Sequence, residues 1–158
     1  MNKIELIPIG RVIQGRKEVK DDDWDNVSST IELDATRFTA DALAGLDTFS
    51  HVEVVFYMDR VKPEKIVAGA RHPRNNPDWP KVGIFSQRAK NRPNPIGTTI
   101  CRLIDVRDLR IEVIGLDAVA GSPILDIKPW IKEFQPREAL KQPDWISEVM
   151  RYYWKKPV

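Results

Sequence analysis

The residues best suited to hold a ligand lie in two short segments whose backbone is stiffened by proline. In residues 83–97, two prolines flank Asn94 just after Arg92, and in residues 121–130 a proline follows shortly after Asp126. Because proline fixes the backbone angle φ, the polar groups of both segments are held in one geometry at low entropic cost. This favours ligand binding, with a pair of tight structural turns as the alternative.

Residue types that support metal or nucleophilic catalysis are scarce. His51 and His72 are the only histidines, and neither stands at a metal-ligand spacing. We expect His51, at the start of an apolar stretch, to be a hydrogen-bonded structural residue. Cys101 is the only cysteine, which excludes an internal disulfide, and its apolar surroundings predict a buried side chain and not a nucleophile. We expect no metal, and the sequence identifies no catalytic residue.

Charge is distributed unevenly along the chain. The formal net charge is only +2, but residues 60–102 hold ten basic and two acidic side chains, a local charge of +8, so the remainder carries −6. Such asymmetry within one small domain indicates a surface that meets phosphate or another polyanion. The alternative is a solvated loop without a partner.

Length and composition predict a single globular domain. The chain has 158 residues, of which 42% are hydrophobic and 30% charged, values typical of folded proteins with one core. No apolar run approaches the ~18 residues of a membrane-spanning helix, and the first residues lack the apolar core of a signal peptide. We expect a cytoplasmic protein with no membrane partner.

The elements that must position the two segments are mainly strands. Several stretches alternate polar and apolar residues or are rich in β-branched residues, whereas the helix signals are short, and no strand is followed by a glycine-rich turn into a helix, which excludes a Rossmann site. We expect an all-β dominated barrel with short peripheral helices. The expected strands are residues 4–13, 29–34, 50–58, 82–85, 98–106 and 109–116, the helices residues 39–46 and 143–153, and the irregular stretches residues 71–80, 86–97 and 117–129.

The two proline-stiffened segments, in this order, resemble the signature segments of the TrmO/YaeB-like family. The matching residues are Arg92-Pro93-Asn94-Pro95-Ile96-Gly97 and Gly121-Ser122-Pro123-Ile124-Leu125-Asp126-Ile127-Lys128-Pro129-Trp130, supported by Ile9-Gly10, Gly45-Leu46, Phe49-Ser50-His51, Arg71-x-Pro73-Arg74 and Gly83-Ile84-Phe85. The resemblance spans about residues 5–131. It implies one domain over residues 1–158, a single-sheeted β-barrel with a C-terminal helical tail at about residues 143–154.

The resemblance also implies an activity. Family members are S-adenosyl-L-methionine-dependent methyltransferases that act as homodimers on N6 of a threonylcarbamoyl-modified adenosine in the tRNA anticodon loop. Methyl transfer from a sulfonium to an amine is an in-line displacement that needs orientation and no protein nucleophile. The alternatives are a methyltransferase acting on another RNA or a small molecule, and a non-catalytic module that binds the cofactor or RNA.

The family's functional residues carry over to matching positions. For the cofactor these are Arg92, Pro93, Asn94, Pro95, Ile96, Gly97, Leu103, Asp126, Ile127 and Lys128, together with Trp24, Asp59 and Arg60, which occupy corresponding places but differ in residue type. We expect Asp126 to bind the cofactor and not to act as a general base. For RNA, the basic stretch nominates Arg71, Arg74, Arg88 and Lys90, and Trp79 or Trp130 for base stacking, with packing as the alternative for each tryptophan.

The chain departs from the family pattern in four ways. Residues 89–91 replace a usual Ser-Pro pair and its neighbour, Trp130 replaces a tyrosine, and Asp59 replaces a histidine. The sequence also stops at Val158, without the extra C-terminal domain of longer members. The departures bear on the methyl acceptor more than on the cofactor.

Overall fold

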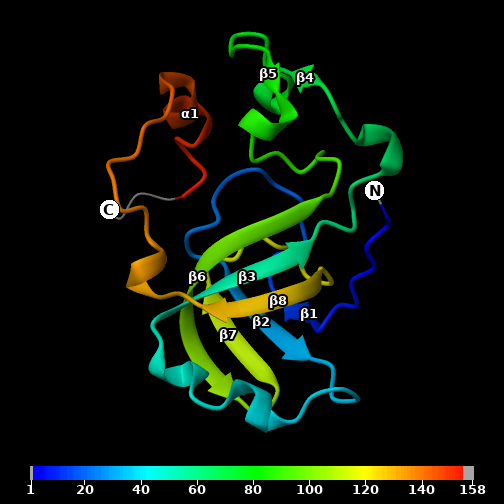
Figure 1. The fold of residues 1–158 in the computed structure, drawn as a ribbon, viewed down its shortest axis with the longest axis vertical. Helices are drawn as coiled ribbons and strands as arrows, with labels where there is room; N and C mark the ends of the chain where they lie inside the picture. Colours follow the sequence, from blue (N-terminus) through cyan, green and yellow to red (C-terminus); the bar gives the residue numbers. More distant parts are fainter. Residues whose placement is uncertain (1, 155–158) are drawn as a thin grey trace.

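The computed structural model describes residues 2–154, in which six antiparallel strands close into a barrel (Figure 1). The order around the barrel is β1-β2-β7-β6-β3-β8, so β3 lies between β6 and β8. The expected all-β barrel is confirmed. The strands are β1 (Gly10–Gln14), β2 (Ser28–Leu33), β3 (His51–Tyr57), β6 (Ile96–Arg107), β7 (Arg110–Ile114) and β8 (Pro123–Pro129).

A second layer of structure stands above one end of the barrel. It consists of residues 60–95, which we call the basic arm, and of the C-terminal segment that contains α1 (Asp144–Val149) (Figure 1). The arm holds a two-stranded sheet of β4 (Ala70–Arg71) and β5 (Val82–Gly83). The remaining elements are the 3-10 turns η1 (Ala40–Leu43), η2 (Leu46–Thr48), η3 (Pro63–Lys65), η4 (Pro73–Asn75), η5 (Ile84–Ser86) and η6 (Lys132–Phe134).

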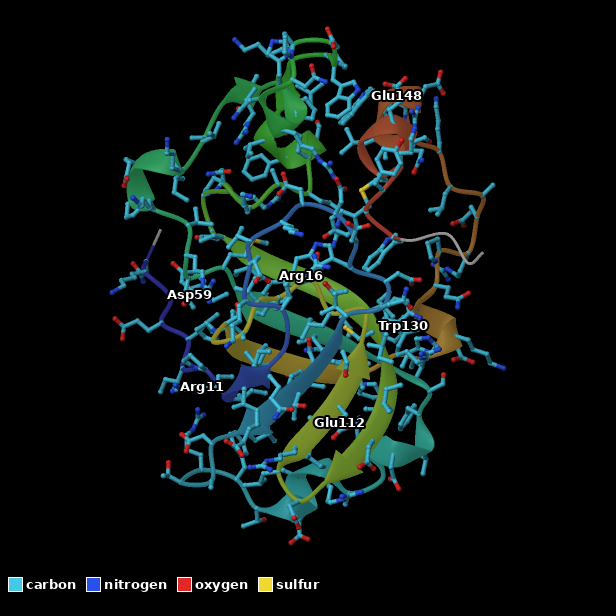
Figure 2. All side chains as sticks on the ribbon, turned by 180° about the vertical axis from the view of Figure 1, so that it is seen from behind. Arg11, Arg16, Asp59, Glu112, Trp130 and Glu148 are labelled. Atoms are coloured by element: carbon cyan, nitrogen blue, oxygen red, sulfur yellow. The ribbon has the colours of Figure 1, made fainter. Side chains whose placement is uncertain are left out.

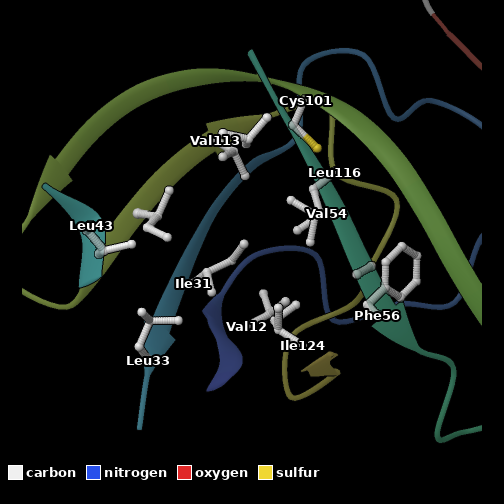
Figure 3. Packing of buried hydrophobic residues seen from close by; sticks show 13 residues of the cluster. Val12, Ile31, Leu33, Leu43, Val54, Phe56, Cys101, Val113, Leu116 and Ile124 are labelled. Carbon is white, nitrogen blue, oxygen red and sulfur yellow. The ribbon is translucent and has the colours of Figure 1, made fainter. Parts of the chain in front are cut away.

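The barrel is filled by alternate side chains of its strands, as its hydrophobic pattern predicts. In β3, Val52, Val54 and Phe56 are buried and lie in one cluster with residues from the other strands (Figure 3). The Phe56 ring packs directly on the backbone of Gly97, where an added Cβ would lie 2.3 Å from the ring. This close approach explains why the first segment must end in glycine.

Three of the predicted segments were wrong in their bounds. The strand expected at residues 82–85 ends at Gly83, because a 3-10 turn begins at Ile84. The strand expected at residues 4–13 begins only at Gly10, because residues 2–8 pair with no described strand and Pro8 has no N–H to donate. The stretch 117–129 is irregular only at its start, since β8 pairs with both β3 and β1. Prolines at both ends of β8 and a bulge at Leu125, which shifts the alternation, conceal this strand in the sequence.

The helices are shorter than expected. In place of the helix expected at residues 39–46, two 3-10 turns cover Ala40–Leu43 and Leu46–Thr48. Gly45, with a φ of 81°, interrupts them, and the Thr39 side chain makes no capping hydrogen bond. The terminal helix covers only Asp144–Val149 of the expected residues 143–153. The hairpin between β6 and β7 is confirmed, with its turn at Asp108, which adopts the left-handed conformation.

Candidate active site

The barrel brings the two proline-stiffened segments to the same region, one on either side of β3. In the antiparallel register, Val55 of β3 lies between Thr98 of β6 and Asp126 of β8. The first segment enters β6 through Ile96, which pairs with Tyr57 at the end of β3. Three neighbouring strands therefore fix the spacing of the two segments.

The chain that leaves β3 passes between these segments and is tied to both. The N–H of Met58 donates to the carbonyl of Pro95 at 2.8 Å. The Arg60 guanidinium donates to the carbonyls of Lys17 and Ala120, each at 2.8 Å. Arg60 thus braces the loop that leads into β8, and Asp59 is exposed beside it.

Arg92 stabilises the first segment from within. Its guanidinium donates to the carbonyl of Gln87 and, at 3.4 Å, to that of Ile84, and its Cζ lies 5.7 Å from the centre of the Phe85 ring. These contacts hold the turn that displays Asn94, which is exposed. Arg92 therefore stabilises the backbone conformation of the first segment.

Asp126 and Lys128 lie on the outer face of the barrel and form an ion pair. Their side chains are 48% and 59% exposed, and one carboxylate oxygen of Asp126 accepts the N–H of Ile127 at 2.9 Å. An ion pair this exposed contributes at most about 1 kcal/mol to stability. A polar ligand can therefore compete for either group at little cost in stability.

Other residues nominated for the cofactor face the core. Leu103 and Ile127 are packed against the buried cluster. Leu103 also lies at the end of β3 far from the first segment, where its N–H donates to the carbonyl of Ser50. Trp24 is 3% exposed, with the Arg16 guanidinium 4.1 Å from its ring centre.

Trp130 lies at the same far end, where its N–H donates to the carbonyl of His51. Figure 2 shows Asp59 and Trp130 on opposite sides of the barrel. Within one chain, the structure brings together residues 92–97, 59–60 and 126. It does not bring Leu103 or Trp130 to them.

The basic arm is held to an acidic loop, residues 17–25, by two ion pairs. Arg74 donates to both carboxylate oxygens of Asp22, at 2.6 and 2.8 Å, and this hydrogen-bonded partner raises the pKa of Arg74. Lys90 pairs with Asp21 at 3.0 Å. Part of the arm's positive charge is therefore matched within the chain. In the sequence, the four aspartates within residues 21–25 are the only sign of this pairing with the basic stretch.

The other basic candidates also have partners within the chain. Arg88 donates to the carbonyl of Thr98 at 2.8 Å, and Arg71 donates to the side-chain oxygen of Asn75 at 2.7 Å. Trp79 donates its indole N–H to Glu148 of α1 at 2.9 Å, which joins the arm to the C-terminal segment. These contacts give the candidates a structural role and leave their RNA contacts as predictions.

Residues 150–154, which we call the C-terminal strap, tie the acidic loop to the barrel. The N–H groups of Asp23 and Trp24 donate to the carbonyls of Tyr152 and Tyr153, each at 2.9 Å. The Tyr153 hydroxyl donates to Asp117, which also accepts from Thr99 of β6. Burial and the charge of Asp117 raise the pKa of Tyr153 well above its usual value. No local pattern marks the pairing of Asp117 with Tyr153, so sequence reasoning missed both residues.

Cys101 and His51 have structural surroundings that explain them without catalysis. Cys101 is buried as expected, and burial, with a smaller effect of Asp117, raises the pKa of its thiol, so that it stays neutral. His51 Nδ1 lies 2.9 Å from the Ser50 hydroxyl. Across residues 2–154, no three His, Cys, Asp or Glu side chains are grouped to hold a metal ion.

Comparison with known proteins places this arrangement in a family. Residues 19–135 match the model of the tRNA-methyltransferase O N-terminal domain. A probable S-adenosyl-L-methionine-binding protein of Pyrococcus abyssi is 30% identical over 139 residues, which cover 85% of this chain and 72% of that protein. The human tRNA (adenine(37)-N6)-methyltransferase is 37% identical over 102 residues, 65% of this chain and 23% of the human protein.

Solved structures agree with the sequence comparison. The crystal structure of TrmO from Pseudomonas aeruginosa superposes with a TM-score of 0.71 at 26% identity, covering 88% of this chain and 61% of that one. The chain thus spans about a quarter of the human relative and three fifths of the bacterial structure. Because the family model matches most of its length, the chain belongs to the family of the tRNA-methyltransferase O N-terminal domain.

Proposed function

We propose that this chain is an S-adenosyl-L-methionine-dependent methyltransferase that modifies N6 of an adenosine in tRNA. The observation that carries the proposal is the register of β6, β3 and β8, which sets Arg92 to Gly97 and Asp126 on either side of one strand end. The names of the human and archaeal relatives, a tRNA adenine methyltransferase and a cofactor-binding protein, support the same activity.

The residues present suit this cofactor. When bound, S-adenosyl-L-methionine supplies an activated methyl group that carries positive charge at sulfur. The exposed Asp126 carboxylate can accept hydrogen bonds from hydroxyl or ammonium groups, and the Arg92 turn offers a rigid backbone against which to hold them. Transfer to an amine then depends on orientation and exclusion of water. Arg92 to Gly97, Asp126, Lys128, Asp59 and Arg60 would hold the cofactor.

The finer parts of the proposal concern the acceptor. We expect a threonylcarbamoyl-modified adenosine of the anticodon loop, with Arg71, Arg74, Arg88 and Lys90 of the arm and segment beside it. The alternatives are another RNA, a small molecule, or loss of the reaction with binding retained. The ion pairs of Arg74 and Lys90 bear on this choice, because RNA phosphates must compete with Asp22 and Asp21 for them.

The remaining parts concern assembly and location. We expect one domain over residues 1–158 that works as a homodimer in the cytoplasm. The N-terminal segment supports an assembly, since Ile4 and Ile7 are 82% and 71% exposed and large exposed apolar side chains are often covered by a partner. In the part of the chain described, no helix is long and apolar enough to cross a membrane. Light scattering after gel filtration measures the assembly, and a monomer at all concentrations would contradict it.

Calorimetry and a transfer assay test the activity. Titration with S-adenosyl-L-methionine should give saturable binding, and Arg92→Ala should weaken it at least tenfold while the matched Arg107→Ala, on the exposed β6-β7 hairpin, binds normally. Absence of binding at millimolar cofactor would exclude methyl transfer both to tRNA and to any other acceptor. With labelled cofactor and total tRNA, label in RNA supports the tRNA acceptor, and binding without label would move the acceptor to another molecule or remove the reaction.

A further inference from the structure

A second concave site lies at the opposite end of β3 from residues 92–97 of the candidate active site. A cavity of about 390 Å³ opens where β3 begins, and its lining includes His51 and Arg102. At a rise of about 3.3 Å per strand residue, the six steps along β3 from His51 to Tyr57 separate this cavity from the first segment by roughly 20 Å. The volume falls in the range of sites for small organic ligands.

The floor of the cavity carries a cation with no partner in the described chain. His51 and Arg102 are directly paired across β3 and β6, so their side chains lie side by side on the outer face. The Ser50 hydroxyl, 2.9 Å from Nδ1, fixes the His51 ring. The guanidinium of Arg102 makes no hydrogen bond or ion pair with residues 2–154, unlike that of Arg74 or Arg92. A guanidinium in a concave surface is suited to bind a phosphate.

One wall of the cavity is an aromatic ring held in place. Trp154 lies against Gly115, where an added Cβ would be 3.9 Å from the indole. The Tyr153 ring meets Trp154 edge-on at 4.9 Å, and Tyr153 is itself anchored to Asp117. Ile100 extends the apolar lining. A fixed indole with aliphatic neighbours is a surface on which a planar base can stack.

Two further lining residues carry groups that can recognise the edge of a base. Asn26 offers an amide donor and acceptor, and Asp25 offers a carboxylate. The carboxylate disfavours a second anion beside it, so negative charge on a ligand belongs near Arg102 and a neutral part near Asp25. A phosphate at one side and a stacked base at the other are the two parts of a nucleotide.

We propose that this cavity binds a nucleotide, with its phosphate on Arg102 and His51 and its base on Trp154. The chemistry is shared by a free mononucleotide and by one residue of single-stranded RNA. The cavity borders the candidate active site, because its lining residue Ile100 and Lys128 both pair with Glu53 of β3, but none of its lining residues is among those proposed to hold the cofactor. In an RNA complex it would hold the strand at a second point, away from the reacting base.

Calorimetry tests this site with three probes, namely AMP, adenosine and a single-stranded hexaadenylate. AMP or hexaadenylate should bind at least tenfold more tightly than adenosine, and Arg102→Ala should remove that difference. Trp154→Ala should weaken all binding at least fivefold. Arg107→Ala is the matched control, since it removes an exposed arginine near the other end of β6. Unfolding curves of each variant verify that the fold is intact.

The outcomes separate the sources of the ligand. Binding of AMP alone would assign a free nucleotide, and binding of hexaadenylate alone would assign an RNA strand. No binding of either, or equal binding by wild type and Arg102→Ala, would overturn the site. Arg102→Ala should bind S-adenosyl-L-methionine normally, so failure here is distinguishable from failure of the proposed methyltransferase activity, which Arg92→Ala reports.

Discussion

The barrel and the layer above it are held together by different forces. In the barrel, every strand has two neighbours, and alternate apolar side chains such as Ile31 and Val54 are completely buried. The basic arm and the acidic loop instead meet through polar contacts, including the pairs of Arg74 with Asp22 and Lys90 with Asp21. The apolar core fixes the strand register, whereas the arm and loop bury fewer apolar side chains, chiefly Ile84 and Trp24, and their contact with each other adds hydrogen bonds and ion pairs.

The difference has a consequence for the site. One part of it, the spacing of Gly97 and Asp126, belongs to the barrel and should persist as long as the barrel is folded. The other part, the placement of the arm over it, should respond to single polar substitutions. The following variants test this division.

The largest effect should come from the core. Ile31→Ala leaves a cavity among completely buried side chains and should lower the free energy of unfolding by about 2–5 kcal/mol. Urea denaturation followed by circular dichroism measures it. Leu140→Ala, at a residue 80% exposed, is the control and should change stability by less than about 0.5 kcal/mol. Similar losses in the two variants would mean that the barrel core does not dominate stability.

A smaller and local effect should follow from breaking the arm's ion pair. Asp22→Asn removes the charge that faces the Arg74 guanidinium, whose side chain is only 26% exposed, and should cost about 1–2 kcal/mol. Hydrogen exchange should speed up at residues 70–90 and stay unchanged in β2 and β7. Asp105→Asn, in an exposed pair with Arg107, should leave both regions unchanged. Faster exchange throughout the barrel would contradict the division.

The strap should make stability depend on alkaline pH. Because the pKa of Tyr153 is raised in the folded state, the unfolded chain loses this proton first, near pH 10, and stability falls as pH rises above that value. Tyr153→Phe should lose about 1 kcal/mol at neutral pH through the missing hydrogen bond and show a shallower decline above pH 10. The raised pKa of Cys101 acts in the same direction in both proteins. If the free energy of unfolding fell in parallel for the wild type and Tyr153→Phe from pH 9 to 11, the Tyr153 hydroxyl would not be neutral and buried in the folded state.

The smallest effect on stability is expected at Asp34, which directly follows β2. The Thr36 hydroxyl and N–H both donate to Asp34 and lower its pKa, so this carboxylate stabilises the fold above pH 3.8 and the contribution fades as pH falls below it. Asp34→Asn should flatten the acid limb of the stability profile slightly. Thermal unfolding between pH 3 and 6 measures it, and a steeper acid limb in the variant would reverse the sign.

Sequence reasoning predicted the barrel better than the layer above it. Alternation identified β2 and the β6-β7 hairpin because one face of each strand is buried, and a continuous apolar run identified β3. β8 was missed because its prolines and bulge break the alternation that marks the other strands. The exposed residues 2–8 show the reverse case, in which β-branched composition alone predicted a strand that has no partner.

Site residues divide in the same way. The two segments stood out because proline and glycine have fixed backbone preferences, which are local properties. Arg60 reaches Ala120, and Asp117 reaches Tyr153, across 60 and 36 residues. Contacts of that range follow from the closed barrel and cannot be seen before its strand order is known. Leu103, carried over by resemblance, faces the core, a placement decided by its parity along β6.

The row formed by Thr98, Val55 and Asp126 sets the gap between the two halves of the site in whole residues. Side chains on neighbouring positions of a strand point to opposite faces, so a slip of one residue in β8 would turn Asp126 into the barrel. The gap therefore has no intermediate values that a substitution could tune. Changes in ligand size among descendants of this chain must come from loop residues or from paired insertions in two strands, and a library for redesign should vary the loops and leave the three strands untouched.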